Sequence, residues 1–166
     1  MESGRADLPR IREFMQSPKA FLAHLDECGI ERVGLINYVA PDVMGFTSEV
    51  NTWCARYASA APDRLIAFGS VNPRFTKDPA GETRRVIDLG IRGLKIHPPH
   101  QLFAVNDYRT GGLGAGIGDV FRVAEERGVP VMIHTGTSVF PGARNAYADP
   151  MPADDVGVDF PKLRVI

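Results

Sequence analysis

The stretch Ile91-Arg92-Gly93-Leu94-Lys95-Ile96-His97 has the composition of a short β-strand, with apolar residues leading to an ionisable side chain at the end. Similar runs rich in valine, isoleucine and leucine occupy residues 32–38, 65–72, 129–135 and 163–166. Successive runs are separated by roughly 30 residues, the length of a βαβ unit with one helix between two parallel strands. The spacing therefore predicts an α/β fold built on a parallel sheet.

The segments between these runs carry helix signals. Ser17 before Pro18, and Asp78 before Pro79, each combine a capping residue with a proline in the first helical turn. We interpret the apolar stripe that includes Trp53 as packing against the sheet. The main helices are expected at about residues 17–29, 48–60, 78–90 and 118–128.

The composition is that of a soluble globular domain. The 166 residues are 44% hydrophobic and 23% charged, with a formal net charge of −1. A balanced charge offers no clustered basic surface, so no nucleic-acid partner is expected. No apolar run approaches the ~20 residues of a membrane span, and residues 1–12 lack the apolar core of a signal peptide. We therefore expect a cytoplasmic protein without a membrane partner.

Polar side chains gather at the C-terminal ends of the predicted strands. Asn37, Asn72, His97 and His134 each end or follow an apolar run. Ligands bind at this end of the sheet both in (β/α)8 barrels and in doubly wound sheets. The nucleotide-binding type of doubly wound sheet is disfavoured, because no Gly-x-Gly-x-x-Gly follows the first strand. The glycine-rich segment 111–118 is interpreted as a loop and an early helix turn.

Lys95 and His97 are the first candidates for chemistry. Side chains alternate along a strand, so Leu94 and Ile96 are expected to face the covering helices while Lys95 and His97 face the other way. A charge buried there is costly unless a partner or a metal compensates it. Two interpretations stay open: a pair of functional groups, or a lysine that extends to the rim beside a histidine that caps the following loop.

His134 is the candidate metal ligand. It closes the apolar run Val131-Met132-Ile133 and precedes Thr135-Gly136, where the backbone can open around a site. A neutral imidazole is a common zinc ligand, although a single strand histidine is more often a hydrogen-bonded core residue. His24 and His100 are interpreted as structural, with His100 able to contact a ligand at the mouth of a barrel.

The segment 137–159 is long and irregular, and such loops are usually functional in a compact domain. Arg144 and Asn145 are its candidate substrate-binding residues, because their side chains suit a carboxylate. Asp154 and Asp155 have a simpler interpretation as caps of a short helix that leads to Phe160.

Several of these motifs together resemble the amidohydrolase-related family of metal-dependent hydrolases and decarboxylases. The similar stretches are Gly93 to Pro98, Glu125-Glu126-Arg127-Gly128, Val129 to Gly136 and Phe140 to Asn145. The resemblance runs from about Phe21 onwards and implies a (β/α)8 barrel. Family members bind zinc or another divalent metal through a His-x-His pair on the first strand, a histidine on the fifth and an aspartate on the eighth.

On that pattern His134 corresponds to the fifth-strand metal ligand, and Lys95 and His97 to catalytic positions on the fourth strand. In some amidohydrolases the fourth-strand lysine is carboxylated and bridges two metals, so Lys95 could also be a ligand. No His-x-His occurs in this chain, and a (β/α)8 barrel takes ~250 residues. We therefore expect residues 1–166 to be a single partial domain, truncated at both ends, that covers about strands two to six of a TIM barrel.

The resemblance implies a hydrolase that cleaves a C–N or ester bond of a small molecule, with zinc or another divalent metal in the complete protein. The alternative within the family is non-oxidative decarboxylation. An alternative of another class is a metal-free binding or assembly module, because an open sheet exposes unpaired edges that favour association, for example as a homodimer. The chain alone is expected to be inactive, since one imidazole cannot retain a catalytic zinc.

The sequence also makes two geometric predictions. The runs 32–38, 65–72, 91–97 and 129–135 should be adjacent parallel strands in chain order, with helices on the convex side only. The open concave side should leave inward residues such as Phe68 and Met132 unusually exposed, and it should bring Lys95, His97 and His134 to one surface.

Overall fold

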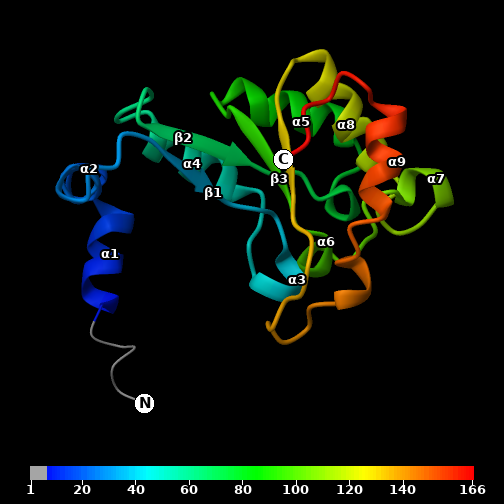
Figure 1. Ribbon diagram of the computed structural model, residues 1–166, viewed down its shortest axis with the longest axis horizontal. Helices are drawn as coiled ribbons and strands as arrows, with labels where there is room; N and C mark the ends of the chain where they lie inside the picture. Colours follow the sequence, from blue (N-terminus) through cyan, green and yellow to red (C-terminus); the bar gives the residue numbers. More distant parts are fainter. Residues whose placement is uncertain (1–6) are drawn as a thin grey trace.

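Four parallel strands form the centre of the molecule. The computed structural model describes residues 7–166. Its strands are β1 (Val33–Ile36), β2 (Leu65–Gly69), β3 (Gly93–Ile96) and β4 (Val131–Ile133), hydrogen-bonded in the order β1-β2-β3-β4 (Figure 1). This half-barrel confirms the predicted α/β class and the partial TIM barrel with strands in chain order.

The fifth predicted strand, residues 163–166, forms only an isolated parallel bridge between Val131 and Val165. The backbone N–H of Val131 donates to the Arg164 carbonyl at 2.9 Å, and Ile133 donates to Ile166 at 2.9 Å. The segment thus continues the sheet beyond β4 without becoming a full strand. The predicted strand therefore has the right position, but only one residue of it forms a β-bridge.

Helices follow the strands as the caps predict. The Ser17 hydroxyl accepts from the backbone N–H of Ala20 at 3.2 Å, and the Asp78 carboxylate accepts from Gly81 at 2.8 Å. The helices are α1 (Leu8–Gln16), α2 (Pro18–Glu27), α3 (Pro41–Met44), α4 (Glu49–Ala58), α5 (Pro79–Asp88), α6 (Pro98–Gln101), α7 (Asp107–Thr110), α8 (Ile117–Glu126) and α9 (Pro152–Asp159), with short 3-10 turns η2 (Pro73–Phe75) and η3 (Asn145–Tyr147).

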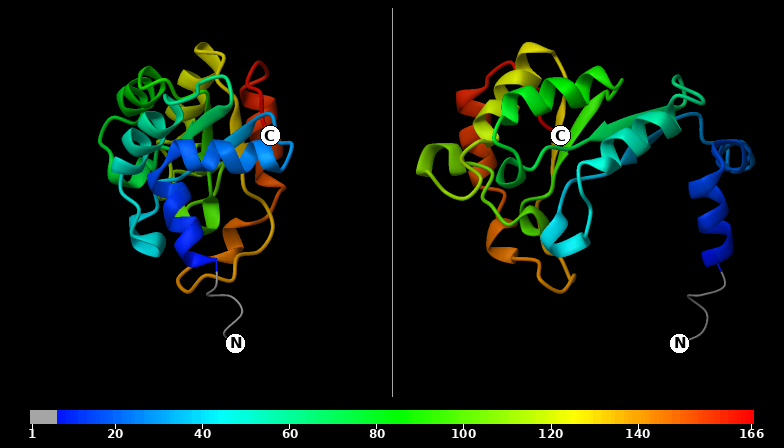
Figure 2. Two further views of the ribbon diagram at one scale, coloured as in Figure 1. Left: turned by 90° about the vertical axis from the view of Figure 1, so that its left-hand side faces the viewer. Right: turned by 180° about the vertical axis from the view of Figure 1, so that it is seen from behind.

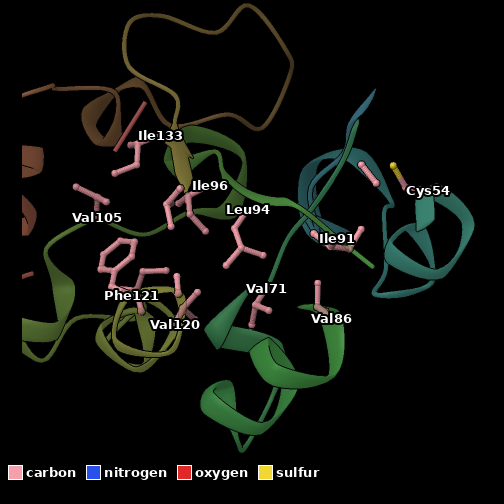
Figure 3. Close-up of a cluster of buried hydrophobic side chains, with 14 of the residues drawn as sticks. Cys54, Val71, Val86, Ile91, Leu94, Ile96, Val105, Val120, Phe121 and Ile133 are labelled. Atoms are coloured by element: carbon pink, nitrogen blue, oxygen red, sulfur yellow. The ribbon is translucent and has the colours of Figure 1, made fainter. Parts of the chain in front are cut away.

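The core lies between the sheet and its covering helices. Leu94 and Ile96 of β3 are fully buried, together with Val86 of α5 and Phe121 of α8 (Figure 3). Helix α4 packs on β2, and α5 packs on α8. Figure 2 shows α1 and α2 at the β1 end of the sheet, away from α5, α8 and α9. None of the described helices is long and apolar enough to cross a membrane.

The opposite, inner face of the sheet is only partly open. Ile36 is 50% exposed and Met132 is half-buried, but Phe68 is 9% exposed, so the prediction of an exposed Phe68 was wrong. The reason is the pair of glycines beside it. Phe68 is paired with Gly93, and its ring fills the space that side chains at Gly34 and Gly93 would occupy.

Trp53 also differs from the prediction. The sequence predicts core packing for Trp53, but the residue is 38% exposed, whereas Tyr57 one turn later is buried. Trp53 lines a hollow of about 590 Å³ beside β1, together with Ile36 and Phe46. The tryptophan therefore faces the free edge of the sheet, where no further strand covers it among the described residues.

Gly93→Ala should destabilise the protein by about 1–3 kcal/mol, the usual cost of overpacking a core. The added methyl group would lie 2.6 Å from Phe68 Cδ1 and 2.9 Å from Cζ, so the ring must shift. Urea denaturation measures the effect, and Phe68→Leu in the same chain should recover part of it. Gly157→Ala is the control, because nothing lies within 4 Å of the new atom there. Equal effects of the two substitutions would contradict the packing argument.

Candidate functional site

Three predicted site residues lie together on the inner face of the sheet. The core position of Leu94 and Ile96 places Lys95 and His97 on the opposite face. The backbone N–H of His134 donates to the Ile96 carbonyl at 2.9 Å, which sets the end of β4 beside the end of β3. The His97 and His134 rings consequently stack, with centroids 3.9 Å apart and planes at 10°.

A third imidazole extends this arrangement. The His100 ring also stacks on His97, with centroids 3.8 Å apart and planes at 21°. His100 Nδ1 lies 2.9 Å from the Tyr38 hydroxyl, and Nε2 lies 2.6 Å from the Ser138 hydroxyl. We call His134, His97 and His100 the imidazole stack. It links the segments that follow β1, β3 and β4.

Burial keeps the imidazole stack neutral. Burial lowers the pKa of His97 to about 3, with smaller contributions from the neighbouring His100, His134 and Lys95. Burial also lowers the pKa of His134, with a further contribution from Lys95, and it lowers the pKa of His100, with a further contribution from His134. At neutral pH these rings therefore carry no charge, which is the form that binds metals.

Lys95, unlike the three imidazoles, is mostly charged at neutral pH. Burial lowers the pKa of its ammonium to about 8. At pH 7 most molecules still carry the charge, since pH 7 lies below that pKa. Lys95 therefore places a positive charge beside neutral imidazoles on the inner face.

Gln101 holds the ends of three strands together. Its side chain is fully buried. Gln101 Oε1 accepts from the backbone N–H of His97 at 2.8 Å. Its Nε2 donates to the Val39 carbonyl at 3.1 Å, and it lies 3.3 Å from the Ser70 hydroxyl and 3.4 Å from the Val71 carbonyl. Gln101 positions the backbone of His97 relative to β1 and β2.

The asparagines at the strand ends donate hydrogen bonds to backbone carbonyl groups. Asn37 donates to the Phe68 carbonyl at 2.7 Å, and Asn72 donates to the Val39 carbonyl at 3.1 Å. Their predicted place at the C-terminal end of the sheet is right. Both amide groups nevertheless bridge neighbouring strand ends and are not free donors for a ligand.

Arg144 and Asn145 lie in the loop after β4, where their predicted role in substrate binding stays a prediction. Asn145 Oδ1 accepts from the Ser138 backbone N–H at 2.8 Å, and Nδ2 donates to the Ser138 carbonyl at 3.2 Å. The Arg144 backbone N–H donates to the Pro99 carbonyl at 2.9 Å, while its side chain is exposed. Asn145 thus shapes the loop that carries Ser138.

Asp154 and Asp155 lie in the first turn of α9 and do not cap it, which corrects the predicted capping. The helix begins at Pro152 without a side-chain cap. Asp155 instead accepts from Asn106 Nδ2 at 2.7 Å and from Arg109 Nη1 at 2.5 Å. The Asp155 carboxylate therefore joins α9 to Asn106 and to Arg109 of α7.

Tyr38, Ser138 and Gln101 are site residues that sequence reasoning missed. Each carries a polar group near the end of a predicted strand, which is the one signal that could have marked them. That signal is weak, because many such polar groups satisfy the backbone, as Asn37 and Asn72 do.

The donor atoms fit part of a metal site. His134 Nε2 and His97 Nδ1 are buried and have no hydrogen-bond partner, and an unpartnered imidazole nitrogen is a metal-ligating atom. Over residues 7–166, no group of three or more His, Cys, Asp or Glu side chains is arranged to hold an ion. The described residues therefore offer two unpartnered imidazole nitrogens, of which the resemblance assigns only His134 to the metal, and they do not form a complete site.

The four parallel strands, with polar groups at their C-terminal ends, form part of a (β/α)8 barrel. The sequence matches the amidohydrolase family over residues 13–166, so the chain belongs to that family. No curated protein is similar enough to count as a match.

Solved structures share the fold. An uncharacterized TIM-barrel protein from Bordetella bronchiseptica is 27% identical with a TM-score of 0.66, and the match covers 90% of this chain and 50% of that one. The 5-carboxyvanillate decarboxylase of Novosphingobium aromaticivorans, solved with manganese, is 19% identical with a TM-score of 0.63, covering 89% and 47%. The 2,6-dihydroxybenzoate decarboxylase from Rhizobium is 19% identical with a TM-score of 0.59, covering 89% and 54%. This chain spans about half of each.

Proposed function

We propose that this chain supplies part of the active site of a metal-dependent hydrolase that cleaves a C–N or ester bond of a small molecule. One observation carries the proposal: the unpartnered His134 Nε2 is buried on the same face as Lys95. Membership of the amidohydrolase family supports it.

The residues have distinct proposed roles. His134 would bind zinc or another divalent ion through Nε2, and that ion would supply Lewis acidity and an activated water. The manganese in the similar decarboxylase structure supports a divalent ion. His97, stacked on His134 and hydrogen-bonded through its backbone to Gln101, would fix the plane of the ligand ring. Lys95 would stabilise negative charge on the substrate.

Non-oxidative decarboxylation is the second candidate reaction. Two of the similar solved structures are decarboxylases of aromatic acids. The positive charge of Lys95 would suit a carboxylate as well as it suits an anion formed during hydrolysis. Both reactions use the same inner face.

A substrate panel separates the two reactions. The complete protein that carries this chain would be loaded with Zn²⁺ or Mn²⁺ and incubated with N-acyl compounds and esters on one side and aromatic carboxylic acids on the other. Acid release supports hydrolysis, and release of CO₂ supports decarboxylation. Turnover that survives removal of the metal with a chelator would contradict the proposal.

Residues 1–166 alone are expected to retain no stoichiometric zinc and to turn over neither class of substrate. A catalytic zinc needs about three protein ligands, and residues 7–166 hold no such group. Elemental analysis after gel filtration, together with the same substrate panel, checks this expectation. One tightly bound metal per chain would show that the assignment of His134 as a single remaining ligand is wrong.

A further inference from the structure

His100 joins the loop that follows β4 to the segments that follow β1 and β3. The residue is only 2% exposed, and both of its ring nitrogens have a hydroxyl partner. The Tyr38 hydroxyl lies 2.9 Å from Nδ1, and the Ser138 hydroxyl lies 2.6 Å from Nε2. A neutral imidazole has one donor and one acceptor nitrogen, and a hydroxyl serves as either. The ring can therefore form both hydrogen bonds at once without carrying a charge.

Further contacts hold residues 138–147, which we call the α6 loop, against the short helix α6. The loop passes beside α6, and η3 contacts that helix (Figure 1). The Phe140 ring meets the His100 ring edge-on, with centroids 5.2 Å apart and planes at 75°. The Arg144 backbone N–H donates to the Pro99 carbonyl at 2.9 Å. His100 thus holds the loop through both a hydrogen bond and an aromatic contact.

Of these two segments, α6 is the more firmly held. The His100 ring stacks on His97, and the neighbouring Gln101 is fully buried and accepts from the His97 backbone. The α6 loop, by contrast, is mostly exposed, and Val139 at its tip is 94% exposed. Segments with few buried contacts open locally at a low cost in free energy. The hydrogen bond from His100 to Ser138 is therefore a contact that keeps a weakly held loop on a firm support.

The α6 loop also has a place in the proposed site. It carries Arg144 and Asn145, the predicted substrate-binding residues, and it follows the C-terminal end of β4. Barrel enzymes bind their ligands at this end of the strands. Each contact described above joins two residues of this chain, so none of them depends on the part of the barrel that the chain does not span.

We propose that His100 is a positioning residue that holds the α6 loop on α6 and thereby orders Arg144 and Asn145 for the substrate. A loop that is already ordered loses less conformational freedom on binding, so the substrate binds more tightly. The effect on substrate rests on the proposed function, whereas the closure of the loop does not. His100 has no role in the proposed chemistry, so its loss should change KM and not kcat.

The first test is amide hydrogen exchange of residues 1–166, followed by NMR without metal or substrate. His100→Phe keeps a ring on His97 but removes both hydrogen bonds, so the Arg144 amide should exchange roughly tenfold faster. Ser138→Ala should have a similar effect. His100→Gln, whose amide group can reach the position of Nε2, should restore most of the protection. His100→Asn, whose amide group lies near the position of Nδ1, should not.

Two controls separate loop opening from general unfolding. Val139→Ala alters the exposed neighbour of Ser138 and should leave exchange at Arg144 unchanged. The Leu94 amide, which donates to the Pro130 carbonyl at 2.8 Å within the sheet, should keep its exchange rate in every variant. Unchanged exchange at Arg144 in both His100→Phe and Ser138→Ala would overturn the inference. Equal acceleration at Arg144 and Leu94 in both variants would also overturn it, because the whole fold would then be opening.

The second test uses the complete protein with the N-acyl compound, ester or aromatic acid that it turns over. His100→Phe should raise KM by roughly tenfold at nearly constant kcat, and His100→Gln should restore KM. A fall in kcat at constant KM would contradict the positioning role. Failure of the proposed function looks different: a complete protein without metal-dependent turnover would contradict the enzyme, while selective loop opening in the exchange experiment would still establish His100 as the residue that holds the loop.

Discussion

His134→Ala should abolish metal-dependent turnover of the complete protein. His134 Nε2 is buried without a partner on the inner face, and it is the proposed metal ligand. Loss of a residue that merely supports a ligand costs roughly 10–100-fold in metal affinity or activity. Loss of the ligand itself should cost more than that. Steady-state kinetics with added metal, together with metal analysis of the purified variant, measures the effect.

His24→Ala provides the control for this prediction. His24 lies in α2, where its ring stacks on Phe14 with centroids 4.9 Å apart, and it takes no part in the imidazole stack. The variant should keep its metal and its turnover. A similar loss in both variants would point to general damage, and full activity of His134→Ala would exclude this histidine as a ligand.

Gln101→Leu should lower the free energy of unfolding by about 2–4 kcal/mol, at roughly 1 kcal/mol for each buried hydrogen bond lost and more for groups left unpaired. Leucine has a similar volume but offers no partner to the backbone N–H of His97 or to the Val39 carbonyl. Both groups lie in the buried region where three strand ends meet.

Urea denaturation measures this difference, with Gln16→Leu as the matched control because Gln16 is exposed at the end of α1. The control should change stability by less than about 0.5 kcal/mol. If Gln101→Leu were as stable as the unaltered chain, water or a shifted backbone would have to replace the hydrogen bonds, and Gln101 would not position His97.

The sequence determined the parts of this protein that depend on neighbouring residues. Period-two alternation in residues 91–97 placed Lys95 and His97 on one face, and capping signals at Ser17 and Asp78 located two helices. The same local motifs indicated the amidohydrolase family, to which the chain belongs. These features are readable because strand parity and helix caps involve only residues a few positions apart.

Only the tertiary structure decided which side chains meet. Gln101 reaches Val39 across 62 positions of sequence, as His100 reaches Tyr38, and no local pattern encodes either contact. Phe68 is buried because the residue paired with it on the next strand is a glycine, which depends on the register of two strands. Packing and hydrogen bonding between distant segments are set by the fold as a whole. The sequence therefore predicts on which face of a strand a side chain lies, and the tertiary structure determines which residues that side chain contacts.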